Sequence, residues 1–182
     1  MATEIELRGP LTKTEFQRVF SFLKKKGRFI KKIKRKTFVY YFPNKKLDIR
    51  IRITNGFSEI VVKEGVWSSR KRQEVIFPIN SKSVKKAQKF LAALGYTKGG
   101  IALRESYIFK FKYVEFALVK CPKGYYFYEA EFIKNKKIVN PEKYILDILN
   151  SLNLKVWSEK EVIKFFMFCK KRIDKPFRIN KI

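Results

Sequence analysis

The 182-residue sequence contains no histidine and only two cysteines. Without imidazole, Ser-His-Asp and Cys-His nucleophiles and histidine-ligated metals are all excluded. Cys121 and Cys169 lie far apart and lack Cys-x-x-Cys spacing, so they predict neither a disulfide framework nor a zinc site. Any metal bound by this chain must therefore be held by oxygen ligands.

Long apolar runs are also missing, and the first residues lack the apolar core of a secretory signal. We therefore expect a cytoplasmic protein with no membrane partner. Acidic residues are scarce, with 16 against 43 basic ones and a net charge of +27. Such a charge favours polyanionic partners, including nucleic acid through the basic surface, although a lysine-rich solvated surface explains it equally well.

Apolar residues are plentiful, at 46% of the chain with 18 phenylalanines, and no segment reads as a linker between two cores. The length suits one domain, which we place at residues 1–175, followed by a frayed tail at 176–182. A monomer and a homodimer are both compatible with this composition.

Residues 2–8 alternate strictly, with Ile5 and Leu7 on one face and charged residues on the other, which predicts a half-buried strand. Thr12 and Glu15 form a capping-box signature for a helix that ends at Gly27. Further helices are predicted from Ser81 to Gly95, from Asn140, and from Ser158 to about residue 172. The apolar stripe of the second helix comprises Val84, Ala87, Phe90, Leu91 and Leu94.

Asn55-Gly56 stands between two alternating runs and predicts a type I′ hairpin over residues 47–64. Such a turn places Thr54 opposite Phe57 and fixes the other cross-strand pairs. One face then presents Arg50 and Arg52, and the pairs on that face are Arg52 with Glu59, Arg50 with Val61 and Asp48 with Lys63.

Four more segments repeat this alternation of charged and apolar faces: residues 70–79, 101–112, 113–120 and 124–133. The predicted fold class is α+β: a closed antiparallel barrel of about eight strands that encloses a tunnel, with helices packed outside. Closure removes exposed strand edges and leaves a lumen wide enough for a ligand.

Several of these strands carry like charges two residues apart, which repel unless a ligand or counter-ion lies between them. A triphosphate with a divalent cation supplies counter-charges of both signs, because arginine clamps phosphate oxygens and paired glutamates hold Mg²⁺ or Mn²⁺. The residues proposed for this ring are Glu4, Glu6, Arg8, Arg50, Arg52, Lys63, Arg72, Glu74, Arg104, Glu129 and Glu131.

The order of these motifs resembles the CYTH superfamily, the triphosphate tunnel metalloenzymes that include class IV adenylyl cyclases and thiamine- and tripolyphosphatases. Residues 4–8, EIELR, resemble the opening ExExK motif, Arg50-Ile51-Arg52 resembles RxR, and Glu129-Ala130-Glu131 resembles the late ExE pair. Lys63, Arg72-Gln73-Glu74 and Arg104 follow the same order over roughly residues 2–172.

The resemblance implies roles for these residues and a small-molecule triphosphate as partner. Metal ligands would be Glu4, Glu6, Glu129 and Glu131, and the catalytic residues Glu4, Glu6 and Lys63. Phosphate would be bound by Arg8, Arg50, Arg52, Lys63, Arg72 and Arg104, with Glu74 and Glu115 in support. Arg8 replaces the usual lysine, and Val119 stands where the family has a metal-associated aspartate.

Three functions follow from these motifs. The leading one is a metal-dependent hydrolase of tripolyphosphate or of a nucleoside or thiamine triphosphate. The second is a class IV adenylyl cyclase that makes cyclic AMP from ATP. The third is a non-catalytic module that binds polyphosphate or RNA and has lost its metal chemistry at Val119.

Overall fold

A computed structural model of the chain describes residues 2–41, 47–65, 70–133 and 137–180, without the side chains of residues 2–4, 71 and 72. The described elements, in chain order, are β1 (Ala2–Leu11), α1 (Lys13–Lys26), β2 (Arg28–Tyr40), β3 (Leu47–Thr54), β4 (Phe57–Glu64), β5 (Lys71–Ile79), a short 3₁₀ helix (Ser81–Ser83), α2 (Val84–Ala93), β6 (Lys98–Phe111), β7 (Val114–Lys120), a second 3₁₀ turn (Pro122–Gly124), β8 (Tyr126–Phe132), α3 (Pro141–Ser151), α4 (Glu159–Arg172) and β9 (Lys175–Arg178).

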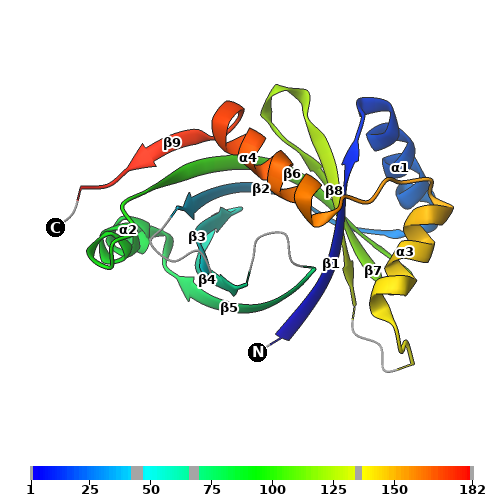
Figure 1. Ribbon diagram of the computed structural model, residues 1–182, viewed down its shortest axis with the longest axis horizontal. Coiled ribbons are helices and arrows are strands. Elements are labelled where there is room, and N and C mark those ends of the chain that lie inside the picture. Colours follow the sequence, from blue (N-terminus) through cyan, green and yellow to red (C-terminus); the bar gives the residue numbers. More distant parts are fainter. Residues whose placement is uncertain (1, 42–46, 66–69, 134–136, 181–182) are drawn as a thin grey trace.

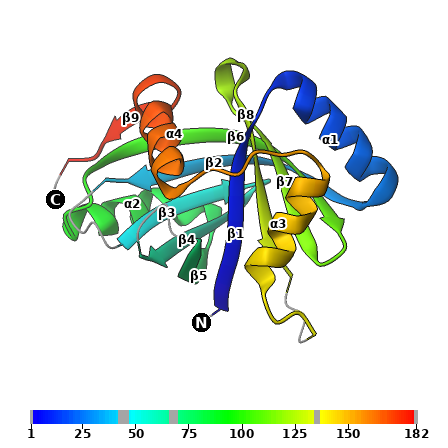
Figure 2. The same ribbon diagram turned by 45° about the vertical axis from the view of Figure 1, so that its right-hand side comes forward.

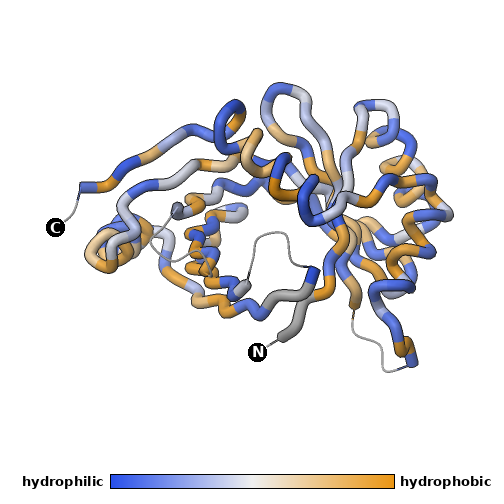
Figure 3. The backbone as a smooth tube through the Cα atoms, viewed as in Figure 1, coloured by the Kyte–Doolittle hydropathy of each residue, from blue (hydrophilic) through white to orange (hydrophobic). Residues whose placement is uncertain are grey.

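The strands pair in the order β2-β3-β4-β5-β1-β8-β7-β6-β9, and β2 also pairs with β6. Because β2 pairs with β3 on one side and with β6 on the other, β1 to β8 form a ring of antiparallel strands (Figure 1). The α+β barrel predicted from the sequence is confirmed. In Figure 3 hydrophilic and hydrophobic residues alternate along β3 and β4, as expected for strands with two different faces.

Helices pack on the outside of this ring (Figure 2). The largest core cluster joins Phe16, Val19 and Leu23 of α1 and Ile145 and Leu149 of α3 to the outer faces of β1, β6, β7 and β8. These helices cover one side of the barrel, whereas α2 lies near the other end and packs Leu91 against β2 and β3. Burial of these apolar faces therefore leaves the inner faces of the strands free for polar residues.

The hairpin of β3 and β4 has the predicted register, including Thr54 opposite Phe57 and Asp48 opposite Lys63. Asn55 and Gly56 have φ values of 48° and 90°, the left-handed conformations that a type I′ turn requires. The capping boxes of α1 at Thr12 and of α4 at Ser158 are also present. The turn sequence therefore correctly predicted the hairpin that carries Arg50 and Arg52.

Two details of the second helix differ from the sequence prediction. Asn80 rather than Ser81 accepts the first capping hydrogen bond, because a 3₁₀ turn precedes α2. Phe90 and Leu94, predicted to face the core, are 60% and 56% exposed. The helix lies near the end of the barrel, where none of the described elements buries the far side of its stripe.

The predicted frayed tail is wrong for residues 176–178, which form β9 together with Lys175 and extend the free edge of β6 at Lys98–Ile101. Phe177 packs its ring against Phe38 and Tyr40, with centroids 5.5 Å and 5.2 Å apart. Backbone pairing and an aromatic contact thus order a segment whose sequence predicts a solvent-exposed, frayed end.

No helix among the described residues is long and apolar enough to cross a membrane.

Candidate functional site

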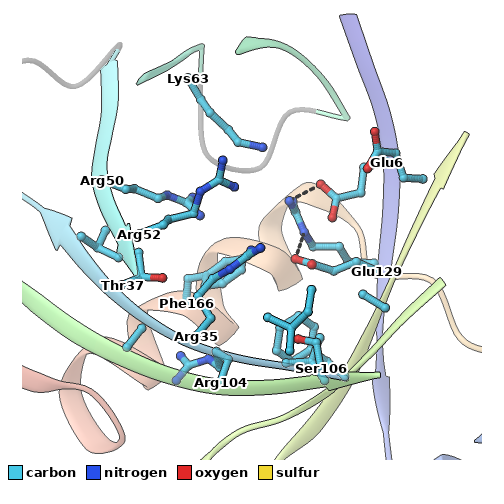
Figure 4. A pocket seen from close by; sticks show the side chains of 18 of the residues that line it. Glu6, Arg35, Thr37, Arg50, Arg52, Lys63, Arg104, Ser106, Glu129 and Phe166 are labelled. Atoms are coloured by element: carbon cyan, nitrogen blue, oxygen red, sulfur yellow. Dashed lines mark hydrogen bonds and ion pairs between the residues drawn. The ribbon is translucent and has the colours of Figure 1, made fainter. Parts of the chain in front are cut away.

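The inner faces of the strands enclose a cavity of about 310 Å³. Among the residues that the structure describes, eight basic and five acidic side chains line it, an excess of three positive charges in the described lining. Arg50, Arg52 and Lys63 project from one wall, and Glu6 and Glu129 face them from the opposite wall (Figure 4). The strands predicted to carry a charged inner face thus bring these residues together around one space.

The basic wall is built on the β3–β4 hairpin, where alternation sends Arg50, Arg52 and Lys63 inward. Arg52 Nη2 lies 2.9 Å from Glu74 Oε1, and Lys63 Nζ lies 3.2 Å from Glu74 Oε2. Glu74 does not line the cavity itself, so it holds two cations from behind. The supporting role of Glu74 stays a prediction.

Arg50 forms an ion pair with the fully buried Asp48. Burial opposes the charged form of Arg50, but Asp48 outweighs it and raises the pKa of Arg50 above its ordinary value. Arg50 therefore remains charged while it faces the cavity.

On the opposite wall the Arg8 guanidinium bridges two glutamates. It pairs with Glu6, and its Nε lies 3.2 Å from Glu129 Oε1. Burial would lower the pKa of Arg8, yet the two carboxylates raise it, and Arg8 likewise holds the pKa of Glu129 below its usual range despite burial. Arg8 also lies 5.8 Å from the ring centroid of Phe166, a cation–π contact.

Arg35 of β2 is a cavity residue that the sequence motifs did not include. Its Nε donates to Thr54 Oγ1 at 3.1 Å, and among the described residues it has no carboxylate within ion-pair distance. Burial and the neighbouring Arg52 lower the pKa of Arg35. Its cross-strand partner Arg104 also lines the cavity, and Arg104 Nη2 lies 2.9 Å from Asp174 Oδ1.

Three glutamates occupy neighbouring register positions on three adjacent strands. Glu131 of β8 pairs with Glu6 of β1 on one side and with Glu115 of β7 on the other, and all three line the cavity. Oxygen-only donors of this kind suit Mg²⁺ or Mn²⁺. Within the described part of the chain, however, no three acidic side chains converge on one point, and Glu6 is engaged by Arg8.

Two predicted site residues, Glu4 and Arg72, have side chains outside the described part of the structure. Their backbones are cross-strand partners on β1 and β5. Val119, where the resemblance led us to expect an acid, does face the cavity and is 2% exposed. It packs in an apolar cluster with Phe127 and Trp157, so an apolar cluster stands at the position of the missing carboxylate.

Other lining residues also escaped prediction: Lys31, Phe166, Lys170 and Asp174. Lys31 and Arg35 lie on the face of β2 that points into the cavity, and every second residue of β2 shares that face. The connection from β2 to β3 is longer than a tight turn, so the sequence alone does not set the register of these residues against Arg52. The last three lie on α4 or just after it, and no local pattern shows how a helix docks on a barrel.

The barrel with its charged interior and outer helices shares its fold with several solved structures. The PH1012 protein of Pyrococcus horikoshii matches with a TM-score of 0.70 and 24% identity over 85% of this chain and 94% of that one. A candidate adenylate cyclase from Vibrio parahaemolyticus matches with a TM-score of 0.66 and 14% identity over 88% and 97%.

A third structure is a candidate adenylyl cyclase from Hippeastrum with a dominant triphosphatase activity, which matches with a TM-score of 0.56 and 14% identity over 91% of this chain and 96% of that one. No family model and no curated protein matches the sequence. At these identities the likeness concerns the fold, and function has to be argued from the cavity.

Proposed function

We propose that the cavity binds the phosphate chain of a triphosphate and that the protein is a divalent-metal-dependent triphosphatase. One observation carries the proposal: the cavity contains a half-buried guanidinium, Arg35, with no carboxylate partner among the described residues. A buried cation without a counter-charge is costly, and a phosphate oxygen would remove that cost.

The phosphate chain would lie between the two walls. Arg50, Arg52 and Lys63 would bind its oxygens from the hairpin side, with Arg35 and Arg104 along β2 and β6. Arg72 is proposed to bind phosphate as well, because of its position in the sequence motif. Hydrolysis at a terminal phosphorus forms one bond to a water oxygen and breaks one to the bridging oxygen. It needs alignment and charge neutralisation more than covalent catalysis.

The divalent metal in this proposal is Mg²⁺ or Mn²⁺. Glu4, Glu6, Glu129 and Glu131 would hold it, with Glu115 in support, because their oxygen donors suit a hard cation. When bound, the ion would neutralise phosphate charge as a Lewis acid. Glu6 and Glu129 are held by Arg8 in the structure, so cation binding there competes with that ion pair.

An adenylyl cyclase is the second candidate, because Phe127 and Phe166 give the cavity an aromatic part that could accept a base. A non-catalytic polyphosphate- or RNA-binding module is the third. It is favoured by the apolar cluster at Val119 and by the lack of three converging acids among the described residues.

The test is incubation with ATP, or with tripolyphosphate, in Mg²⁺ or Mn²⁺, followed by product identification. Phosphate with ADP supports the triphosphatase, whereas cyclic AMP with pyrophosphate supports the cyclase. A Glu6→Gln, Glu131→Gln double variant is expected to lose metal-dependent turnover while keeping its fold. Tight metal-free binding of tripolyphosphate with no turnover would leave the non-catalytic module and reject the enzyme.

A further inference from the structure

A second hollow, of about 570 Å³, lies on the outer face of the sheet behind the cavity wall. Residues that line it come from four neighbouring strands and the turn after β7: Lys34, Lys36, Ile53, Leu103, Glu105, Lys120, Cys121 and Pro122. Arg35 and Arg104 lie in the wall between the two spaces, since they also line the cavity. We call this hollow the outer groove.

Two helices mark the ends of the outer groove. Lys120 Nζ lies 5.3 Å from the ring centroid of Phe16 on α1. Ile53 belongs to the cluster that includes Leu91 of α2. Figure 1 shows α1 and α2 at opposite ends of the long strands β2 and β6. The groove is therefore the strip of outer sheet that neither helix covers.

The groove is strongly basic. Glu105 is the one acidic residue among those that line it, and this carboxylate is shared between Lys32, at 3.0 Å, and Lys120, at 3.9 Å. Lys34 and Lys36 have no carboxylate within ion-pair distance in the described part of the chain. The ammonium of Lys36 lies 5.0 Å from the Phe38 ring, which holds it at the surface.

Between these lysines the floor is apolar. Ile53 and Leu103 lie on either side of Lys36, because both are its cross-strand partners. Leu103 is 43% exposed. A small anion would use the charges alone, whereas a polymer with regular phosphates and apolar sugar and base surfaces would use both features. A duplex hides its base faces and would leave the floor without a contact.

We infer that the outer groove binds single-stranded RNA, with backbone phosphates on Lys34, Lys36 and Lys120 and the sugar and base surfaces on Leu103 and Ile53. Lysines supply point charges without a fixed fork, which suits binding that is independent of base sequence. The inference is separate from the proposed triphosphate site, because it concerns the opposite face of β2 and β6.

The probe is an oligouridine of roughly 12 nucleotides with a 5′-hydroxyl and a 3′-fluorophore, long enough to cross a site of this type. Without a 5′-phosphate it has no end group for the cavity. Fluorescence anisotropy with the full chain measures its affinity at several salt concentrations. We expect saturable binding that weakens with salt.

The test compares two doubly charge-reversed variants with the same net charge. Lys34→Glu with Lys36→Glu alters the groove, and Lys85→Glu with Lys86→Glu alters exposed residues of α2. We expect the groove variant to bind at least about tenfold more weakly, with a salt slope lower by about 1.4, which corresponds to two lost phosphate contacts. The α2 variant should bind nearly as the unaltered chain does.

Leu103→Ser tests the apolar floor and should weaken binding a few-fold without changing the salt slope. Equal weakening by both charge-reversed variants would mean that general surface charge attracts the RNA and would overturn the inference, as would displacement by one equivalent of tripolyphosphate. Arg52→Met, which alters a residue that lines the cavity but not the outer groove, should keep RNA binding, so failure at the cavity and failure at the groove are distinguishable.

Discussion

Arg35 on β2 lies directly opposite Arg104 on β6, and within the described residues only Arg104 has a carboxylate partner, Asp174 at 2.9 Å. Two arginines at a cross-strand position repel each other. The arrangement therefore leaves Arg35 as the half-buried charge that a bound phosphate would satisfy.

Arg35→Met is expected to weaken tripolyphosphate binding by about tenfold or more, as the loss of a hydrogen bond to a charged group costs about 1.5–3 kcal/mol. Removal of an unpaired cation should leave the melting temperature of the free protein unchanged or higher. Thermal unfolding with and without tripolyphosphate measures both effects, with Lys85→Met as the control. A lower melting temperature with an unaltered ligand shift would show a structural role instead.

Arg8→Met should destabilise the fold, because it leaves Glu6 and Glu129 facing each other without their cation. Loss of one partner of a buried ion pair costs about 3–5 kcal/mol, with the lower value apt here since Glu129 is one-third exposed. Urea unfolding measures the loss, and Mg²⁺ or Mn²⁺ should recover part of it if the glutamates hold the ion. Arg8→Lys, which keeps the charge, should lose less; equal losses would contradict this reading of the ion pair.

Val119→Asp tests whether the acid expected from the family pattern can be restored. Val119 is 2% exposed beside Phe127 and Trp157, and a charge buried in apolar surroundings is destabilising. We expect a loss of roughly 3 kcal/mol or more in unfolding free energy against about 1 kcal/mol for Val119→Ala. A Val119→Asp protein as stable as the parent would show that this end of the cavity is wetter than the packing indicates.

Glu161 gives a pH prediction for α4, which carries Phe166. Lys155 and the Ser158 cap lower the pKa of Glu161 to about 2. Because the pKa of Glu161 is lower in the folded protein than the unfolded value near 4.3, ionised Glu161 stabilises the fold above that pH. This stabilisation is lost as the pH falls toward 2. The melting temperature of Glu161→Gln should therefore fall below the parent's at pH 6 and approach it between pH 4 and 2. A constant difference across that range would rule out the titration of Glu161 as its cause.

Much of the barrel follows from local signals. The Asn55-Gly56 turn sets the register of β3 and β4 residue by residue, so the inward placement of Arg50, Arg52 and Lys63 could be derived. Alternation along β7 and β8 likewise places Glu115, Val119 and Glu131 on the inner face.

The rest depends on contacts between distant segments. Arg35 acquires its place through the pairing of β2 with β6, about seventy positions away in the chain, and Phe166 through the docking of α4. Strand β9 forms because β6 extends beyond β7 and offers a free edge there. Local periodicity describes none of these events, since each one is decided by the geometry of the assembled barrel.

The central claim is tested most directly by calorimetric titration of the full chain with tripolyphosphate in EDTA, at an ionic strength that screens the surface lysines. The account predicts saturable binding of one tripolyphosphate per chain, weakened by Arg35→Met and by Arg52→Met and unaffected by Lys85→Met. Binding that does not saturate would contradict this proposal. So would weak binding of several tripolyphosphates per chain that these cavity substitutions do not change, because the anion would then be bound at the surface.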